Sequence, residues 1–231
     1  MLDRRTFVFG SAAAALAGCQ AAPQQVVLPQ QIVYRSQIPE RYVQMYRGMP
    51  QERFPIPAVD LTKVKPIFWR REVENTTGER PGVIVVDTAQ FFLFLTQPDG
   101  KAMRYGVGLG RQGFEWQGDA TIRRKAAWPT WTPPAEMIDR EPDLEKYRNG
   151  MEPGLSNPLG ARALYLYQGR VDTLYRLHGT MEAYSIGNAV SSGCVRLLNQ
   201  DIIDLYNRTP VGTKVIVRQQ NNPVPGQRGV V

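Results

Sequence analysis

The sequence is poor in the side chains that build disulfide scaffolds and metal centres. Its 231 residues include two cysteines and one histidine. So few thiols and imidazoles cannot supply four structural zinc ligands, and they exclude a disulfide-dense scaffold as well. A histidine-rich catalytic metal site is excluded for the same reason, and we expect no bound metal. Any thiol or imidazole chemistry must therefore involve Cys19, Cys194 or His178.

Residues 1–18 have the pattern of an export signal. A short basic start is followed by an apolar stretch over residues 7–17 and by small residues before Cys19. The apolar stretch is about half of the ~20 residues that a membrane-spanning helix needs. Residues 16–19 read LAGC and resemble the lipobox of bacterial lipoproteins, in which the cysteine is acylated after cleavage. We expect residues 1–18 to be a signal peptide and Cys19 to carry a lipid.

Two properties of this signal stay open. Residues 4–8 (RRTFV) resemble a twin-arginine export signal, but Asp3 stands where Ser or Thr is usual, and ordinary secretory signals also carry paired arginines. Gln20 follows Cys19, whereas lipoproteins of this kind stay at the inner membrane mainly when Asp follows. We expect an exported protein on the periplasmic side, at the outer membrane in preference to the inner one. The alternative is an alanine-rich helix of a cytosolic protein with a buried Cys19.

The charge balance is basic, with a formal net charge of +7. A basic surface can bind nucleic acid, but an exported protein rarely meets any. Anionic cell-wall polymer and lipid headgroups are better candidates, so we expect no nucleic-acid partner. Hydrophobic residues make up 42% of the chain, which is enough to bury the core of one ordinary domain.

The exported chain divides into three parts. Residues 19–80 are expected to form a lipidated tether and an N-terminal extension. The tether, residues 20–31, is rich in Gln, Ala and Pro, and the extension packs on the domain with short helices or strands at most. The catalytic domain is expected over residues 81–218, and a flexible tail over residues 219–231.

The domain is predicted to be mainly β, with few short helices and long loops. Runs of β-branched and aromatic residues predict strands, and a short amphipathic pattern predicts a helix at residues 201–206. The predicted strands are residues 83–87, 90–95, 102–107, 161–167, 173–177 and 212–218. Glycines 106, 108 and 110 lie where the backbone must bend or approach closely. They do not form a phosphate loop, because no helix and no Lys-Ser/Thr pair follows them.

Residues 111–160 are rich in Trp, Pro and Gly, and they predict a long loop with little regular structure. Loops of this length in a compact domain are usually lids or binding walls. Trp128 and Trp131 therefore either line a cleft or cover an edge of the core.

His178 and Cys194 are the candidates for a base and a nucleophile in the mature domain. A thiol is mostly protonated at neutral pH, whereas the thiolate attacks carbonyl carbons. A nearby imidazole takes up the thiol proton and returns it to the leaving amine. Amide groups of Gly193 and Cys194 could form an oxyanion hole, and a carbonyl near Gly179 could orient the imidazole. The spacing of sixteen residues alone leaves open a buried Cys and a core His.

The segment 178–196 reads HGTMEAYSIGNAVSSGCVR and closely resembles the signature of L,D-transpeptidases of the YkuD (ErfK/YbiS) family. The resemblance extends over roughly residues 81–218, including WPTWTPP at 128–134 and NPLGARALYL at 157–166. It implies an L,D-transpeptidase-like β-sandwich or mixed sheet that acts on peptidoglycan stem peptides. No metal or organic cofactor is implied.

The resemblance also assigns roles by position. Cys194 would be the nucleophile and His178 the general base and acid, whereas Arg196 would hold a substrate carboxylate or form a structural salt bridge. Many relatives have His directly before the Gly-Cys pair, where this chain has Ser192. The oxyanion-hole and orienting residues would be Gly179, Ser192 and Gly193.

The expected reaction is a cysteine-dependent acyl transfer. The enzyme would release the terminal D-alanine of a tetrapeptide stem and pass the acyl group to the diaminopimelate amine of another stem, giving a 3→3 crosslink. Water as acceptor would make it an L,D-carboxypeptidase, and an envelope protein as acceptor would make it an anchoring transferase. A non-catalytic wall-binding lipoprotein is a further alternative. A cytosolic thiol redox protein is another, but the chain lacks a Cys-x-x-Cys motif. The expected partners are peptidoglycan stem peptides, the membrane through the lipid on Cys19, and in the anchoring case an envelope protein.

Overall fold

The computed structural model describes residues 38–110, 117–191 and 194–219. The predicted signal peptide, the lipidated Cys19 and nearly all of the predicted tail lie outside these residues. No helix of the described part is long and apolar enough to cross a membrane.

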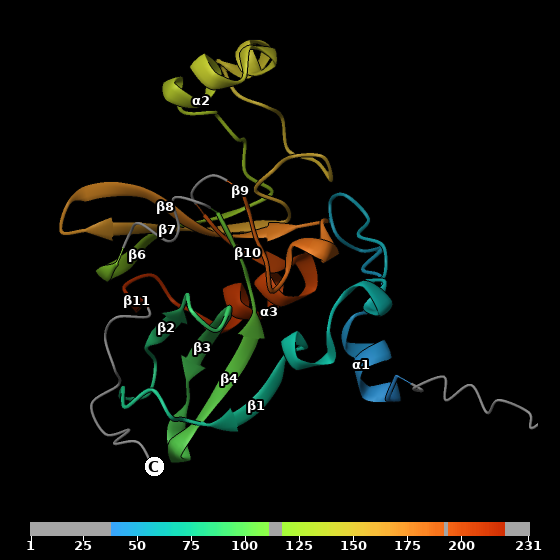
Figure 1. Cartoon of the computed structure of the whole chain (residues 1–231), viewed down its shortest axis with the longest axis vertical. Helices are drawn as coiled ribbons and strands as arrows, with labels where there is room; N and C mark the ends of the chain where they lie inside the picture. Colours follow the sequence, from blue (N-terminus) through green and yellow to red (C-terminus); the bar gives the residue numbers. More distant parts are fainter. Residues whose placement is uncertain (1–37, 111–116, 192–193, 220–231) are drawn as a thin grey trace, which may run out of the picture. The chain divides into compact units, whose positions relative to one another are not determined.

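The described residues form a mainly β structure (Figure 1). The strands are β1 (Arg71–Glu74), β2 (Ile84–Asp87), β3 (Phe92–Thr96), β4 (Lys101–Gly106), β5 (Gly108–Gly110), β6 (Gly118–Ala127), β7 (Arg162–Gln168), β8 (Val171–Thr180), β9 (Ala189–Ser191), β10 (Val195–Leu198) and β11 (Lys214–Arg218). The α-helices are α1 (Glu40–Met45), α2 (Ala135–Arg140) and α3 (Asn199–Arg208). Short 3-10 helices are η1 (Leu61–Lys63), η2 (Pro66–Phe68), η3 (Pro98–Gly100), η5 (Pro142–Tyr147) and η6 (Ala183–Ser185).

These strands join one mixed sheet in the order β1-β4-β3-β2-β11-β6-β7-β8-β10-β5-β9. The pairs β2–β11, β8–β10 and β5–β9 are parallel, and the remaining neighbours are antiparallel. The predicted class, a mainly β mixed sheet with few short helices, is confirmed.

The sheet buries one shared hydrophobic core. Strands β2 to β8, β10 and β11 contribute side chains to it, including the fully buried Ile84, Leu164 and Leu197, so the two halves of the strand order pack on the same core. Each such aliphatic side chain contributes roughly 1.5–3 kcal/mol on burial. Helix α3 adds Ile202 and Leu205 and packs against β7, β8 and β10 (Figure 1).

The segment before residue 81 packs on the rest of the domain through a second cluster. Tyr42, Tyr46 and Trp69 of this segment are buried there together with Ile186 and Leu198. Strand β1, in the same segment, pairs with β4 and so belongs to the sheet.

The position of Phe68 explains why residues 106 and 187 are glycines. Its side chain and backbone occupy the space that a Cβ atom at Gly106 or Gly187 would need. Gly108 is similarly close to the backbone of Ser185. The prediction that glycines 106 and 108 allow close backbone approach is confirmed.

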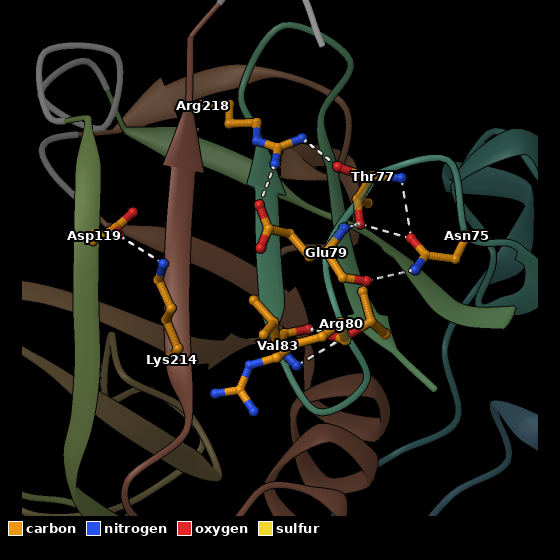
Figure 2. A network of polar contacts seen from close by, with 9 residues as sticks. Asn75, Thr77, Glu79, Arg80, Val83, Asp119, Lys214 and Arg218 are labelled. Carbon is orange, nitrogen blue, oxygen red and sulfur yellow. Dashed lines mark hydrogen bonds and ion pairs between the residues drawn. The ribbon is translucent and has the colours of Figure 1, made fainter. Parts of the chain in front are cut away.

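The C-terminal strand is held by charged side chains at both ends (Figure 2). Arg218 donates hydrogen bonds to the carbonyl of Thr77 at 2.9 Å and to the carboxylate of Glu79 at 2.7 Å. Lys214 forms an ion pair at 2.7 Å with Asp119 on the neighbouring β6. The Arg218 contacts tie the loop before β2 to the last strand of the domain, and the Lys214 ion pair ties that strand to β6.

The prediction of little regular structure over residues 111–160 is wrong for residues 118–127. They form β6, a ten-residue strand that pairs with both β11 and β7. Only two residues of β6, Ala120 and Ile122, are buried in the core, and basic residues follow them directly. Two of these basic side chains lie over aromatic rings, Arg124 over Tyr165 at 4.4 Å and Lys125 over Tyr206 at 4.1 Å. A strand that satisfies its polar face in this way lacks the apolar alternation that reveals a strand in sequence.

Candidate active site

Strands β8 and β10 bring His178 and Cys194 to the same face of the sheet. The two strands are parallel, with Leu177 opposite Val195 and His178 opposite Arg196. Because successive side chains of a strand point to opposite faces, and Leu177 and Val195 lie in the core, His178 and Arg196 lie on the outer face. Cys194, two residues before Arg196, belongs to that same face. The register thus places Cys194 level with Arg176, two residues before His178 on the same face of the sheet.

His178 and Cys194 line one cavity of about 570 Å³. The opposite wall comes from the segment between β6 and β7, through residues that include Trp131, Met137 and Tyr147. Both alternatives raised for the tryptophans occur, one at each residue. Trp131 lines the cavity, whereas Trp128 is buried against the core and donates a hydrogen bond to Glu52 at 2.9 Å.

The His178 ring is buried and held by the backbone of the next residue. Its Nδ1 lies 2.9 Å from the carbonyl oxygen of Gly179. A carbonyl only accepts, so Nδ1 carries the hydrogen and Nε2 keeps a lone pair. Burial lowers the pKa of His178 to about 4; the carbonyl of Gly179 opposes this shift, and the charge of Arg196 adds to it. The imidazole is therefore neutral at pH 7 and available as a base.

Burial also keeps the thiol of Cys194 protonated. It raises the pKa of Cys194, and the backbone and charge of Arg176 and the charge of Arg196 offset this only in part. The side chain is nevertheless partly accessible to solvent, and it is a free cysteine. Burial thus favours the neutral form of both groups, a thiol and an uncharged imidazole.

Arg196 is already engaged by a carboxylate. It forms an ion pair with Glu182 at 2.7 Å, and its side chain is 18% exposed. Of the two roles expected for Arg196, this geometry corresponds to the structural salt bridge, although Arg196 also lines the cavity.

Asn199, the first residue of α3, contacts the backbone next to His178. Its Oδ1 accepts a hydrogen bond from the Ala161 amide at 2.9 Å and lies so close to Gly179 that a Cβ atom there would overlap it. Asn199 therefore fixes the end of β8, whose Gly179 carbonyl orients the imidazole. Sequence reasoning missed Asn199, and the one available signal was a polar residue between a strand and an amphipathic helix.

Residues 81–217, more than half of the chain, match the family model of the YkuD L,D-transpeptidase catalytic domain. The chain belongs to this family.

The relatives of this L,D-transpeptidase-family chain include two proteins of Escherichia coli (strain K12). The probable L,D-transpeptidase ErfK/SrfK is 37% identical over 144 residues, which are 59% of this chain and 44% of that protein. The probable L,D-transpeptidase YbiS is 39% identical over 143 residues, 57% of this chain and 43% of that protein. This chain thus spans less than half the length of either relative.

One solved structure combines high identity with broad coverage. It is described as a probable carnitine operon oxidoreductase caia from Brucella melitensis, is 45% identical, and covers 69% of this chain and 99% of that one with a TM-score of 0.48.

The remaining predicted site residues of this family member are placed as follows. Gly179 lies beside the imidazole, as described, whereas Ser192, Gly193 and Cys19 lie outside the described residues. Within the ranges that the structure describes, no three His, Cys, Asp or Glu side chains are grouped so as to hold a metal ion.

Proposed function

We propose that the protein is a peptidoglycan L,D-transpeptidase in which Cys194 is the nucleophile and His178 the general base and acid. The observation that carries this proposal is the placement of both side chains on one cavity at the outer face of β8 and β10. Membership of the L,D-transpeptidase family supports the reaction class.

The first half of the reaction acylates the enzyme. The Cys194 sulfur attacks the carbonyl carbon that precedes the terminal D-alanine, while its proton passes to Nε2 of His178. Amide groups at Gly193 and Cys194 would stabilise the resulting oxyanion, a contribution of several kcal/mol at the transition state. The imidazolium then gives its proton to the departing D-alanine amine as the carbon–nitrogen bond breaks. A thioester of Cys194 is left.

The second half transfers the acyl group. The side-chain amine of a diaminopimelate from another stem attacks the thioester, His178 takes up the amine proton, and the thiol of Cys194 is restored. The product is a 3→3 crosslink. The backbone of Cys194 is fixed for both halves, because its carbonyl accepts a hydrogen bond from the Gly110 amide on β5 at 3.1 Å.

The proposed location follows from the first nineteen residues. We propose an exported protein on the periplasmic side, anchored through a lipid on Cys19, because a basic start, an apolar stretch and a small-small-Cys sequence occur in that order. Metabolic labelling with a fatty acid should mark the wild-type chain but not Cys19→Ser. Equal membrane partition of both chains would contradict the anchor.

Incubation with purified tetrapeptide muropeptides tests the reaction. The full-length chain should produce crosslinked dimers, detected by mass spectrometry, and Cys194→Ala should lower the rate by at least about a thousandfold because it removes the nucleophile. His178→Gln should cause a comparable loss with the fold preserved in circular dichroism. Full activity of Cys194→Ala would show that the nucleophile is another group.

The same assay separates the alternative functions. Dimers indicate a transpeptidase, and tripeptides with released D-alanine indicate an L,D-carboxypeptidase. Tripeptide attached to an added envelope protein indicates an anchoring transferase. Unchanged substrate with measurable binding indicates a non-catalytic wall-binding protein.

A further inference from the structure

Two arginines and a tyrosine form a row across the outer face of the sheet. The strand register places Arg124 of β6 opposite Tyr165 of β7, and Tyr165 opposite Arg176 of β8. Cys194 directly precedes Val195, which pairs with Leu177, so the thiol continues this row beyond Arg176. The row therefore leads from Arg124 to the proposed nucleophile.

The ring of Tyr165 holds both guanidinium groups. The Cζ atoms of Arg124 and Arg176 each lie 4.4 Å from its centroid, and the tyrosine is 6% exposed. A guanidinium over an aromatic face keeps its N–H edge free for hydrogen bonds while its rotation is restricted. Arg124 is thus partly preorganised for binding.

The row lines a second cavity, of about 580 Å³, that also reaches Cys194. Three arginines, Arg124, Arg140 and Arg176, line it, against the single carboxylate of Glu136. The cavity therefore carries a surplus of positive charge beside the thiol, which favours an anionic ligand.

The two arginines of the row differ in whether a carboxylate already neutralises their charge. Arg176 is held by Asp172 through two hydrogen bonds, at 2.7 and 2.8 Å. Arg124 is exposed and forms no ion pair with any residue of the described ranges. Arg124 is therefore the group of the row that can accept a new carboxylate.

The row also sets the distance between Cys194 and a group bound by Arg124. Neighbouring strands lie roughly 4.8 Å apart, so the Tyr165 ring, which Arg124 overlies, is about 10 Å across the sheet from Cys194. An extended peptide advances about 3.3–3.6 Å per residue. A group bound by Arg124 would thus be separated from the reacting carbonyl by about three residues or by one long side chain.

We propose that Arg124 binds a free carboxylate of the acyl-donor stem peptide, located about 10 Å from the carbonyl that Cys194 attacks. This inference rests on the proposed function. The carboxylate class that fits is one at the end of a long side chain, such as that of diaminopimelate. Arg124, rather than the Glu182-paired Arg196, then selects the donor.

A pair of tetrapeptides tests the proposal. They are identical except that the side-chain carboxylate of the diamino acid is free in one and amidated in the other, and released D-alanine measures kcat/KM for each. Wild-type full-length protein should prefer the free carboxylate by about 10- to 100-fold, the range of a charge-assisted hydrogen bond. Arg124→Gln should lose this preference by losing activity on the free form only, and Arg124→Lys should keep part of it.

Arg123→Gln is the matched control. It removes the same charge one position earlier on β6, where the side chain is exposed and is not among the residues lining the cavity. It should keep the wild-type preference. An Arg124→Gln enzyme that also keeps the preference overturns the inference and leaves the proposed function intact.

Failure of the proposed function gives a different result. If the wild-type protein releases D-alanine from neither peptide, calorimetric binding of both peptides to Cys194→Ala, with and without Arg124→Gln, still decides the role of Arg124. Tighter binding of the free-carboxylate peptide that Arg124→Gln removes supports it. Equal binding of the two peptides contradicts it.

Discussion

At the scale of the residue, burial acts on the two proposed reacting groups in opposite directions and gives one result. It lowers the pKa of His178 to about 4 and raises the pKa of Cys194. Both shifts favour the neutral form, so the structure favours a proton transfer during attack over a preformed thiolate–imidazolium pair. The Gly179 carbonyl, by holding Nδ1–H, leaves Nε2 as the proton acceptor.

The acid limb of the pH–rate profile should reflect this shift. A base with the ordinary histidine pKa of about 6.5 would lose about eightfold in kcat/KM between pH 7 and pH 5.5, because it becomes protonated. With a pKa of about 4, His178 stays neutral over that interval and the loss should be less than about twofold. Initial rates of D-alanine release from pH 4.5 to 8 measure this. A midpoint near 6.5 would contradict the buried, neutral imidazole.

At the scale of the element, the N-terminal segment and the strands are joined by a half-buried carboxylate. Glu52 binds Arg162 of β7 at 2.7 and 3.0 Å and accepts a hydrogen bond from Trp128, at the point where β6 ends. Burial alone would raise the pKa of Glu52, but these hydrogen bonds outweigh it and lower the pKa. The cavity wall that begins after Trp128 is thus fixed from outside the sheet.

Glu52→Ala should therefore destabilise the fold. It leaves a guanidinium and an indole N–H without their partner, which should lower the free energy of unfolding by about 2–3 kcal/mol. Urea denaturation measures the change. Glu74→Ala, which removes an exposed ion pair with Lys101, is the control and should leave the urea midpoint unchanged. Equal effects of the two substitutions would contradict a structural role for Glu52.

Some strands of the sheet can be predicted from the sequence, and others cannot. Apolar runs at residues 83–87 and 90–95 predict β2 and β3, because the buried residues of each strand are contiguous in the sequence. Strand β6 escaped prediction because its outer face is basic. Asn199 and Arg124 escaped because their importance depends on which strands become neighbours, and cross-strand register is absent from a local pattern. His178 and Cys194 could be proposed from a signature, but their shared cavity follows only from the β8–β10 pairing.

At the scale of the whole molecule, a buried polar network links the N-terminal segment to α3. Asp201 is fully buried, accepts a hydrogen bond from Tyr46 at 3.1 Å, and lies 3.6 Å from Nε of Arg70. Arg70 lies closer to Asp204, at 3.0 Å, and Tyr105 also donates to Asp204, at 2.6 Å. One guanidinium thus serves two carboxylates. Burial, which outweighs the charge of Arg70, raises the pKa of Asp201 to about 7.

Asp201 and His178 should give the molecule opposite dependences of stability on pH. Between about pH 4 and 6.5 the unfolded chain protonates His178 and the folded chain does not, so His178 makes stability fall as the pH falls. Between about pH 3.8 and 7 the folded chain keeps Asp201 protonated and the unfolded chain does not, so Asp201 makes stability fall as the pH rises. The two effects oppose each other over their shared range.

Single substitutions should reveal each effect. From pH 5 to 6.5, above the range in which ordinary carboxyls titrate, the free energy of unfolding of the wild-type chain should be nearly constant. His178→Gln should make it decrease as the pH rises, and Asp201→Asn should make it decrease as the pH falls, each by about 1 kcal/mol per pH unit. Urea denaturation at several pH values gives these slopes. A flat profile for Asp201→Asn would mean that His178 does not resist protonation in the fold.

The packing of Phe68 against Gly106 and Gly187 restricts how this chain can diverge. A side chain at either glycine needs space that Phe68 occupies, and Gly187 also has a φ of +80°, which penalises other residues. At position 106 the obstacle is the backbone of residue 68, which no substitution there removes, so position 106 should stay glycine among relatives that keep the N-terminal segment in this place. At position 187 the obstacle is the Phe68 ring, so a lineage that gains a side chain at 187 must first reduce the one at position 68.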